Sequence, residues 1–578
     1  MTRYRRFVAP RRLGAADLAV ALFVFAVLYA LVRLGPALQA PISAAAPEAI
    51  SLDPRFLPYY AGRSLFRMVA AFAASVIFSL AYGYAAARIR GAERLLIPLL
   101  DILQSVPVLG FLSVSLTALM GLFPGRIIGL ELASIFAIFT SQVWNLTFAF
   151  YHALKAVPGE LQLAARVFRL NGWQRFTRLE LPSSMISLVW NGMMSFGGGW
   201  FFLAASEAIT VLNRRLMLPG LGSYLAVALG QANWRAVLWA IATMAAVILL
   251  LDRLFWGPVV AWAEKFKLDQ TPSAAPVQSA VLTLLRRSVL LDALERWIVR
   301  LTEPAADALS RWRAQRNRLP RPAVPSRHSW LAPALRAAAL AGAGAWAARY
   351  GWMGLRLVGS LGPAELSRVA GLGTLTLLRV VAAVVLGALW TVPVGVAIGL
   401  NPRLAGLGQS LAQLAAAFPA NMLFPFVGVL YLRFHVNFEL GAILLMMLGT
   451  QWYILFNVIA GASALPAELR DAASVFRLRG WARWRQVILP AIFPALVTGG
   501  LTAAGGAWNA SIVAEVVTWG AYRLSATGLG AYITHATQAG DRAGIVWSIT
   551  GMALFVVALN RLVWRRLLEV AETRFALE

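Results

Sequence analysis

Two glutamates, Glu207 and Glu515, stand out because each lies within a long apolar stretch of the sequence. If these stretches cross a membrane, an ionisable group inside them is a functional candidate by default, because charge is costly in lipid. The alternative is structural: each carboxylate hydrogen-bonds a neighbouring helix near the outer surface. The structural interpretation is also favoured because a carboxylate without a positive partner would repel any anion that approached it. Both interpretations remain open at this stage.

Three other residues near these glutamates are candidates for a transport pathway. Trp200 and Trp508 lie near paired glycines and could line or gate a path, although tryptophans more often pack at interfaces. Asn509 could donate a hydrogen bond to an anion. Together with Glu207 and Glu515, these residues form the predicted pathway set.

Several other kinds of chemistry are excluded by residue type. The chain has no cysteine, so it has no disulfide, thiolate metal site or cysteine nucleophile. Its four histidines are scattered without ligand spacing, which argues against a metal site. They are His152, His328, His435 and His535.

The composition places the chain in a bilayer. Of its 578 residues, 60% are hydrophobic and 13% are charged, which is too apolar for a soluble protein of this size. The net charge of +27 comes from arginines in short segments between apolar runs. Such segments follow the positive-inside rule, whereas nucleic-acid binders gather basic residues on one water-facing surface. We therefore expect the chain to lie in a lipid bilayer and not to bind nucleic acid.

Apolar stretches of about 20 residues predict an all-α polytopic fold with about twelve transmembrane helices. The first is expected to be a retained helix and not a secretory signal, because it is too long and has no cleavage pattern at its end. The expected spans are 16–34, 65–87, 95–120, 127–152, 184–212, 236–262, 332–352, 371–399, 405–432, 436–461, 491–519 and 543–563.

Basic segments recur at every second connection, which places both chain ends on the cytoplasmic side of the inner membrane. We expect a first repeat over residues 1–263 and a second over 329–578, joined by a basic cytoplasmic linker at 264–328. Part of the linker, 277–312, could lie on the inner leaflet as an amphipathic helix. A partly ordered spacer is the equally weighted alternative.

The two halves are tandem copies. Residues 156–182 align without gaps to 464–490 at an offset of 308, and 15 of these 27 positions are identical. The offset continues downstream and pairs Trp200 with Trp508 and Glu207 with Glu515. Because each half has an even number of expected crossings, the copies are parallel repeats. The identity is concentrated in a cytoplasmic loop, which indicates two copies of one docking surface.

Each copy of the loop predicts two short helices at the membrane surface. Val157, Leu161, Ala164 and Phe168 share one helical face, and Glu160 suits the first turn. Glycine then interrupts the helix, and a proline begins the next span.

The loop resembles the signature of binding-protein-dependent ABC importer permeases, which reads EAA, three residues, Gly, nine residues, Ile, one residue, Leu-Pro. The spacing matches in both copies, at 163–182 and 471–490. Two positions depart from it: the signature Glu is Leu163 or Asp471, and the signature Gly is Arg169 or Arg477. Glycine recurs three residues later, which places the turn between the short helices there.

This resemblance implies that each loop, 155–182 and 463–490, inserts as a coupling helix into an ATPase subunit. It implies two copies of a cytoplasmic ABC ATPase, an extracytoplasmic substrate-binding protein, and ATP bound on the ATPase, with no cofactor on this chain. The implied coupling residues are Glu160, Ala164, Ala165, Arg169, Gly172 and Pro182, and Glu468, Asp471, Ala472, Ala473, Arg477, Gly480 and Pro490.

The fused, duplicated form resembles most the nitrate, sulfonate and bicarbonate (taurine-type) class, which implies a small anionic substrate. The chain cannot supply its own ATP-binding loop, because that loop needs Gly-Lys followed by Ser or Thr. Its lysines, Lys155, Lys265 and Lys267, follow Leu, Glu and Phe. We therefore expect a permease that is not itself an enzyme. The main alternative is a secondary transporter, whose halves can also be parallel six-helix repeats.

Overall fold

The structure is a computed structural model. It describes residues 50–89, 91–211, 214–266, 279–288 and 362–575, with a few isolated positions elsewhere. The expected spans at 16–34 and 332–352, and most of the linker, lie outside the described residues. The chain forms two compact units. One comprises Met1–Gln39, Phe148–Met193 and Leu250–Met353, and the other comprises Ala40–Thr147, Met194–Leu249 and Gly354–Glu578.

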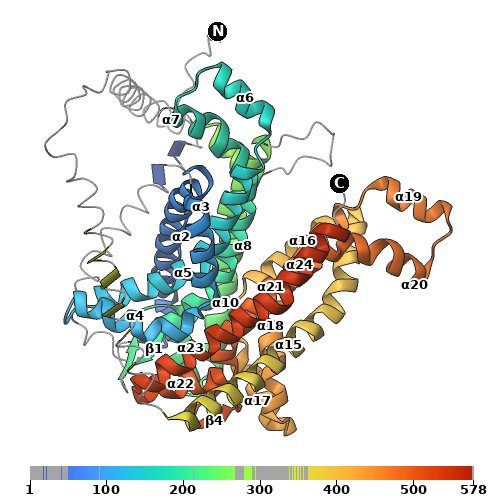
Figure 1. Cartoon of the computed structure of the whole chain (residues 1–578). Helices are drawn as coiled ribbons and strands as arrows, with labels where there is room; N and C mark the ends of the chain where they lie inside the picture. Colours follow the sequence, from blue (N-terminus) through green and yellow to red (C-terminus); the bar gives the residue numbers. More distant parts are fainter. Residues whose placement is uncertain are drawn as a thin grey trace, which may run out of the picture. The chain divides into compact units, whose positions relative to one another are not determined.

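Helices dominate both repeats, as the sequence predicts (Figure 1). The first repeat contains α2 (Leu57–Arg88), α3 (Ala92–Ser105), α4 (Val108–Leu122), α5 (Ile128–Lys155), α6 (Gly159–Val167), α7 (Gly172–Arg175), α8 (Leu181–Glu207), β1 (Ala208–Val211), β2 (Arg214–Met217), α9 (Leu221–Gly230), α10 (Trp234–Leu251) and α11 (Gly257–Ala263). The linker contributes α12 (Ala280–Arg286). The second repeat contains α15 (Pro363–Leu400), α16 (Pro402–Ala417), α17 (Phe424–Phe434), α18 (Phe438–Ser463), α19 (Ala467–Val475), α20 (Gly480–Arg483), α21 (Leu489–Ala514), β3 (Val516–Trp519), β4 (Tyr522–Ser525), α22 (Leu529–Ala539), α23 (Arg542–Leu559) and α24 (Arg565–Arg574).

The tandem repeat of the sequence is also a repeat of structure. The bounds of β1 and β3, of β2 and β4, and of α10 and α23 differ by the same 308 residues. Each strand pair forms a two-stranded antiparallel hairpin directly after the helix that corresponds to the fifth expected span of its repeat, α8 or α21. These hairpins end α8 at Glu207 and α21 at Ala514, before the predicted span ends at 212 and 519. Glu207 and Glu515 therefore lie at helix ends and not inside a span.

Two expected spans are broken helices. The span predicted at 95–120 consists of α3 and α4, with Pro107 as the N-cap of α4. The span predicted at 405–432 consists of α16, a short 3₁₀ turn (Ala420–Met422) capped by Pro419, and α17. Proline has no N–H and its ring clashes with the preceding turn, which explains both breaks.

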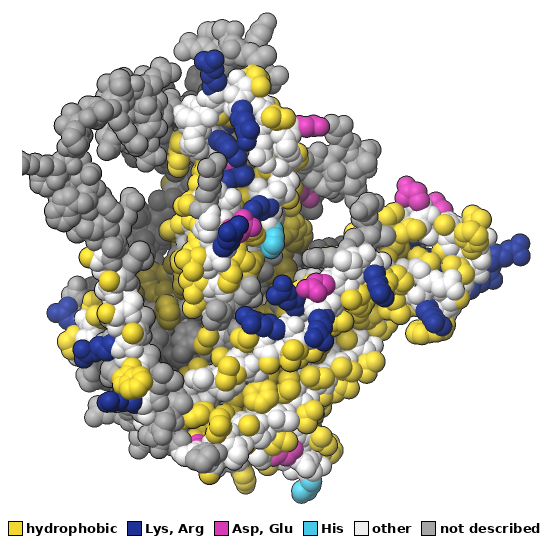
Figure 2. Space-filling model, in the orientation of Figure 1, with side chains coloured by type: hydrophobic (Ala, Val, Ile, Leu, Met, Phe, Trp, Pro, Cys, Tyr) yellow, Lys and Arg dark blue, Asp and Glu magenta, His cyan; other side chains and the backbone are white. Residues whose placement is uncertain are grey.

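Seven helical segments in the described part of the chain are long and apolar enough to cross a membrane. They are Pro54–Arg88, Ile128–Lys155, Trp234–Phe266, Ala364–Leu400, Phe438–Ser463, Gly480–Ala514 and Ala543–Ala571. Figure 2 shows hydrophobic side chains along the flank of the second-repeat helices, as a lipid-facing surface requires. The polytopic all-α prediction is confirmed, and the hairpins are small additions to it.

The core of the second repeat is built by α15, α18 and α21. Buried side chains from the three helices, among them Val380, Leu445 and Ala507, pack into one cluster. Glycines allow close helix contact: a Cβ at Gly499 would lie 3.0 Å from Ile454 Cα. In Figure 1, α19 and α20 project from one end of α18 and α21, and β4, α17 and α22 lie at the other end.

Candidate functional site

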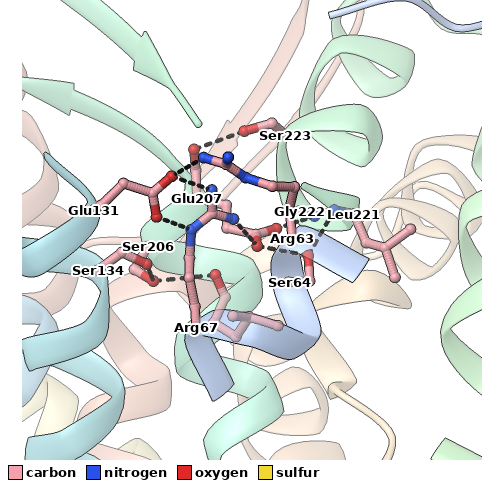
Figure 3. Close-up of polar contacts among 11 residues, drawn as sticks. Arg63, Ser64, Arg67, Glu131, Ser134, Ser206, Glu207, Leu221, Gly222 and Ser223 are labelled. Carbon is pink, nitrogen blue, oxygen red and sulfur yellow. Dashed lines mark hydrogen bonds and ion pairs between the residues drawn. The ribbon is translucent and has the colours of Figure 1, made fainter. Parts of the chain in front are cut away.

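A buried arginine of the first repeat, Arg67 in α2, joins two carboxylates from other helices (Figure 3). Its Nη1 donates to Glu207 Oε1 over 2.6 Å, and its Nε donates to Glu131 Oε2 over 2.6 Å. Arg63 also pairs with Glu131. Two arginines thus balance two glutamates. Such balance matters because an unpaired buried charge is strongly destabilising.

The same cluster fixes the start of α9. Ser64 Oγ donates to Glu207 Oε1 over 2.6 Å and accepts from the amide of Leu221 over 2.9 Å. The Gly222 amide donates to Glu207 Oε2 over 2.7 Å. Glu207 therefore links α2, α8 and α9, and the hairpin lies between two fixed points. We name this cluster (Arg63, Ser64, Arg67, Glu131 and Glu207) the first anchor.

A second anchor repeats this design with Thr376, Arg379, Glu439 and Glu515. Arg379 Nη1 lies 3.0 Å from Glu515 Oε1, and Arg379 also pairs with Glu439. Thr376 takes the place of Ser64: its Oγ1 donates to Glu515 over 2.9 Å and accepts from the Leu529 amide over 2.8 Å. The two anchors differ in exposure, because the Glu439 side chain is 41% exposed and that of Glu131 only 2%.

The repeated Gly-Leu-Gly segments are explained by the anchors. A Cβ at Gly220 would lie 2.3 Å from the Glu207 carboxyl carbon, and one at Gly528 would lie 2.3 Å from Glu515 Oε2. No side chain fits at either position. Glycine is therefore required at both positions because the glutamate carboxylate lies so close to the backbone, and not because of an unusual backbone angle.

The arginines and the additional glutamates were not predicted from the sequence. Glu131 and Glu439 follow the offset of 308, but Ser64 and Arg67 match Thr376 and Arg379 at an offset of 312. A difference of four residues is about one helical turn, which keeps the same face toward the carboxylates. A search at both offsets would have found the basic partners.

The remaining predicted pathway residues lie apart from the anchor contacts. Trp200 and Trp508 are 1% exposed. The Trp200 ring meets the edge of Phe196 with 6.0 Å between ring centroids, and Trp508 packs against Phe555 at 6.2 Å. Asn509 Oδ1 accepts from the amide of Val108 over 2.8 Å, so it caps the first turn of α4. Asn509 thus ties the second repeat to the broken helix of the first.

The coupling loop of the first repeat turns at an arginine. Helix α6 ends at Val167, and Arg169 adopts φ = 51°. The amides of Arg169 and Leu170 donate to the carbonyls of Arg166 and Ala165, which is the Schellman pattern normally completed by glycine. The turn is therefore at the signature glycine position. Its predicted displacement to Gly172 is wrong, and Gly172 instead begins α7.

The coupling loop of the second repeat has the same turn. Arg477 adopts φ = 52°, and the amides of Arg477 and Leu478 donate to the carbonyls of Ser474 and Ala473. Gly480 begins α20 and also has a positive φ of 53°. The signature position thus keeps its backbone geometry in both repeats although its residue has changed.

Both loops expose large apolar side chains. Val167 and Phe168 are 78% and 76% exposed, and their counterparts Val475 and Phe476 are 76% and 75% exposed. Phe168 does not share a buried face with Val157, which is buried, because Phe168 follows the last helical residue and points outward. Trp173 and Trp481 are exposed as well. We call these six residues the loop patches.

The other predicted coupling residues surround the loop patches. Glu160, Glu468, Asp471 and both turn arginines are exposed, and Ala164 and Ala472 are half-buried. Ala165 and Ala473 are buried, and their carbonyls accept the hydrogen bonds that close the turn within the loop. Pro182 lies at the second position of α8, and Pro490 lies at the second position of α21.

Known proteins resemble the chain over the same two repeats. The family model described as binding-protein-dependent transport system inner membrane component matches residues 75–255 and 361–569. The bicarbonate transport system permease protein CmpB of Synechococcus elongatus is 28% identical over 190 residues, which cover 32% of this chain and 64% of the relative. The chain thus spans just under two thirds of that relative's length.

Two further relatives are named for the transport of other compounds. The nitrate import permease protein NrtB of Leptolyngbya laminosa is 29% identical over 123 residues, covering 21% of this chain and 42% of the relative. The taurine transport system permease protein TauC of Escherichia coli is 27% identical over 143 residues, covering 25% and 50%. The family match covers more than half of the chain and confirms the resemblance seen in the loops. The chain belongs to the family of binding-protein-dependent transport system inner membrane components.

Proposed function

We propose that this chain is the translocation component of an ATP-driven importer for a small anion. It lies in the inner membrane with both ends in the cytoplasm. ATP is hydrolysed by two copies of a separate ATPase, and an external binding protein delivers the substrate. The observation that carries this proposal is the pair of loop patches, which have the same turn and expose the same residues at an offset of 308.

The loop patches are suited to a protein partner. Exposed valine, phenylalanine and tryptophan next to arginines are unfavourable in water, and contiguous apolar surface of this kind marks interaction sites. Two equivalent patches call for two equivalent grooves. A dimer of identical ATPase subunits supplies them.

The second repeat offers a mechanical link between its patch and its anchor. Helix α21 is continuous over 26 residues, or about 39 Å, from Leu489 after the loop to Ala514 next to Glu515. A displacement of the loop by the ATPase therefore moves the far end of the same helix. There Glu515 holds α22 and the hairpin, so the movement reaches the outer end of the path.

The proposed substrate is a small oxyanion or sulfonate. The relatives are named for bicarbonate, nitrate and taurine transport, and these compounds share a compact group with several oxygens that accept hydrogen bonds. Uptake of these three compounds by the assembled transporter is the first measurement to make.

The coupling proposal is tested with Phe168→Ser and Phe476→Ser. Both side chains are exposed, so folding should persist, and loss of an apolar anchor from an interface core should weaken ATPase binding by about tenfold or more. Phe434→Ser is the matched control, because Phe434 is 66% exposed at the end of α17, away from the loops. Wild-type co-purification of the ATPase with both loop variants would contradict the proposal.

The secondary-transporter alternative makes the opposite prediction for energy coupling. Vesicles that contain this chain alone should show no uptake driven by a proton or sodium gradient. Uptake from such a gradient with no ATPase present would favour the alternative.

A further inference from the structure

A small cavity lies at the boundary between the two repeats. Its volume is about 40 Å³, and it is lined by residues of α8 from the first repeat and of α18 and α21 from the second. The segment that separates α16 from α17 closes one side with Pro419 and Ala420. This volume holds only about three water molecules, so a hydrated anion passes only if the cavity widens.

One tyrosine lies between two glycines at this boundary. Tyr453 of α18 lies against Gly198 of α8 and Gly506 of α21, which are equivalent glycines 308 residues apart. A Cβ at Gly198 would lie 2.9 Å from Tyr453 Oη, and one at Gly506 would lie 3.3 Å from Tyr453 Cε2. Gly198 therefore leaves room for the Tyr453 hydroxyl, and Gly506 leaves room for the Tyr453 ring and for Thr450, whose Cγ2 would lie 3.2 Å from the Cβ.

The neighbouring glycines do not have this role. A Cβ at Gly505 would meet nothing within 4 Å, and one at Gly197 would meet nothing closer than 3.5 Å. The tight contact is thus specific to one glycine of each pair. In the first repeat Gly199 follows this pair and is required by a separate contact, because a Cβ there would lie 2.5 Å from Gln142 Nε2.

Tyr453 has no equivalent hydroxyl in the first repeat. Its counterpart is Asn145, whose Nδ2 donates to Ser195 Oγ over 2.9 Å within that repeat. The position equivalent to Ser195 is Ala503, which offers no partner. In the second repeat the longer side chain extends across the boundary to α8.

The chemistry of the cavity suits an anion. Among the described residues that line it, Tyr453 has the one polar side chain, and glycine, alanine, phenylalanine and proline supply the rest. The carboxylates of the two anchors are outside this lining. A hydroxyl donor in apolar surroundings forms a stronger hydrogen bond than in water. It also carries no full charge that would trap the anion.

We propose that Tyr453 closes the transport path at the repeat boundary and donates a hydrogen bond to the anion when the path opens. The inference rests on the proposed import function and names one residue that selects the substrate there. Closure of the transport path depends on the Tyr453 ring between Gly198 and Gly506. Selection of the anion depends on the Tyr453 hydroxyl.

The selection step is tested by uptake of bicarbonate, nitrate and taurine into vesicles that hold the assembled transporter. Tyr453→Phe keeps the ring and should lower uptake of the transported compound by about tenfold, because a hydrogen bond to a charged group is lost. ATPase co-purification should not change. Gly198→Ala should also lower uptake, because its methyl group would lie 2.9 Å from the Tyr453 hydroxyl. Gly197→Ala is the matched control. Wild-type uptake by Tyr453→Phe would overturn the role of the hydroxyl.

The closure step is tested separately and needs neither ATPase nor substrate. The chain has no native cysteine, so Ala510→Cys places a single thiol in the cavity lining. A small thiol reagent should label it slowly, and Tyr453→Ala should raise the labelling rate several-fold. Equal rates in folded, monodisperse protein would overturn closure by Tyr453. Increased labelling without any uptake by the wild-type transporter would instead show that the import proposal has failed while the closure stands.

Discussion

The Gly220 Cα faces the Glu207 carboxylate so closely that a methyl group at position 220 would lie 2.3 Å from the carboxyl carbon. Gly528 and Glu515 have the same relationship in the second repeat. Each anchor thus joins a charged network to a backbone segment with no room for a side chain, and substitutions should have sharply local effects.

We expect Gly220→Ala and Gly528→Ala to destabilise the folded protein. The added methyl group must displace a buried, ion-paired carboxylate, and such overpacking costs about 1–3 kcal/mol. Thermal unfolding in nanodiscs, followed by tryptophan fluorescence, measures the change. Gly230→Ala is the control, because its Cβ would meet nothing within 4 Å. Equal midpoints for Gly220→Ala and the control would contradict the close approach.

We expect Arg67→Met to be more damaging than Arg379→Met. Loss of Arg67 leaves Glu207 without its guanidinium and Glu131 with Arg63 alone, and both carboxylates are buried. Breaking a buried pair in this way costs about 3–5 kcal/mol. Loss of Arg379 leaves Glu515 buried, but Glu439 is 41% exposed and can be hydrated. Comparison of the two unfolding midpoints tests the difference, and a larger loss for Arg379→Met would refute it.

We expect Arg477→Gly to stabilise the second coupling loop. A non-glycine residue with φ near 52° is strained by about 1 kcal/mol, and glycine relieves that strain. Slower hydrogen exchange of the Leu478 amide, which closes the turn onto Ala473, would report the gain. Arg479→Gly is the control, because Arg479 has an extended backbone with φ = −129°. Faster exchange in Arg477→Gly than in the control would refute the strain argument.

We expect cysteines at Arg175 and Arg483 to react only with reagents added from the cytoplasm. Both residues lie in the basic coupling loops, and the positive-inside rule places such segments on that side. Labelling of intact cells with a membrane-impermeant thiol reagent tests this. External labelling of either cysteine would overturn the predicted orientation.

The repeats and helices were predictable from the sequence because apolar length and internal identity report them directly. The loop helices α6 and α19 follow from residues that recur in both copies. Pro107 and Pro419 can be recognised in the sequence as points where a membrane helix can break, but Pro98 and Pro494 lie inside continuous helices. Proline position alone does not say which outcome occurs.

Only the glutamates Glu207 and Glu515 of the two anchors were predicted from the sequence, and their partners were missed. Glu207 and Glu515 were evident as charges in apolar surroundings, but their roles depend on partners about 140 residues away in the chain. Ala165 and Ala473 show a related limit. Their small size suggested a surface for a partner, yet their carbonyls close the turn and the residues are buried within the chain. Replacing either by arginine would therefore disturb the loop itself, and the exposed Phe168 and Phe476 are the better probes of docking.

The contrast between Asn145 and Tyr453 bears on why both repeats lie in one polypeptide. A transporter assembled from two identical subunits must place the same side chain on both sides of its two-fold axis. Such a transporter would therefore place either two tyrosines or no tyrosine at its small central cavity. Fusion removes that symmetry constraint. The hydroxyl of Tyr453 can therefore occupy the boundary alone, while the equivalent residue Asn145 donates its hydrogen bond to Ser195.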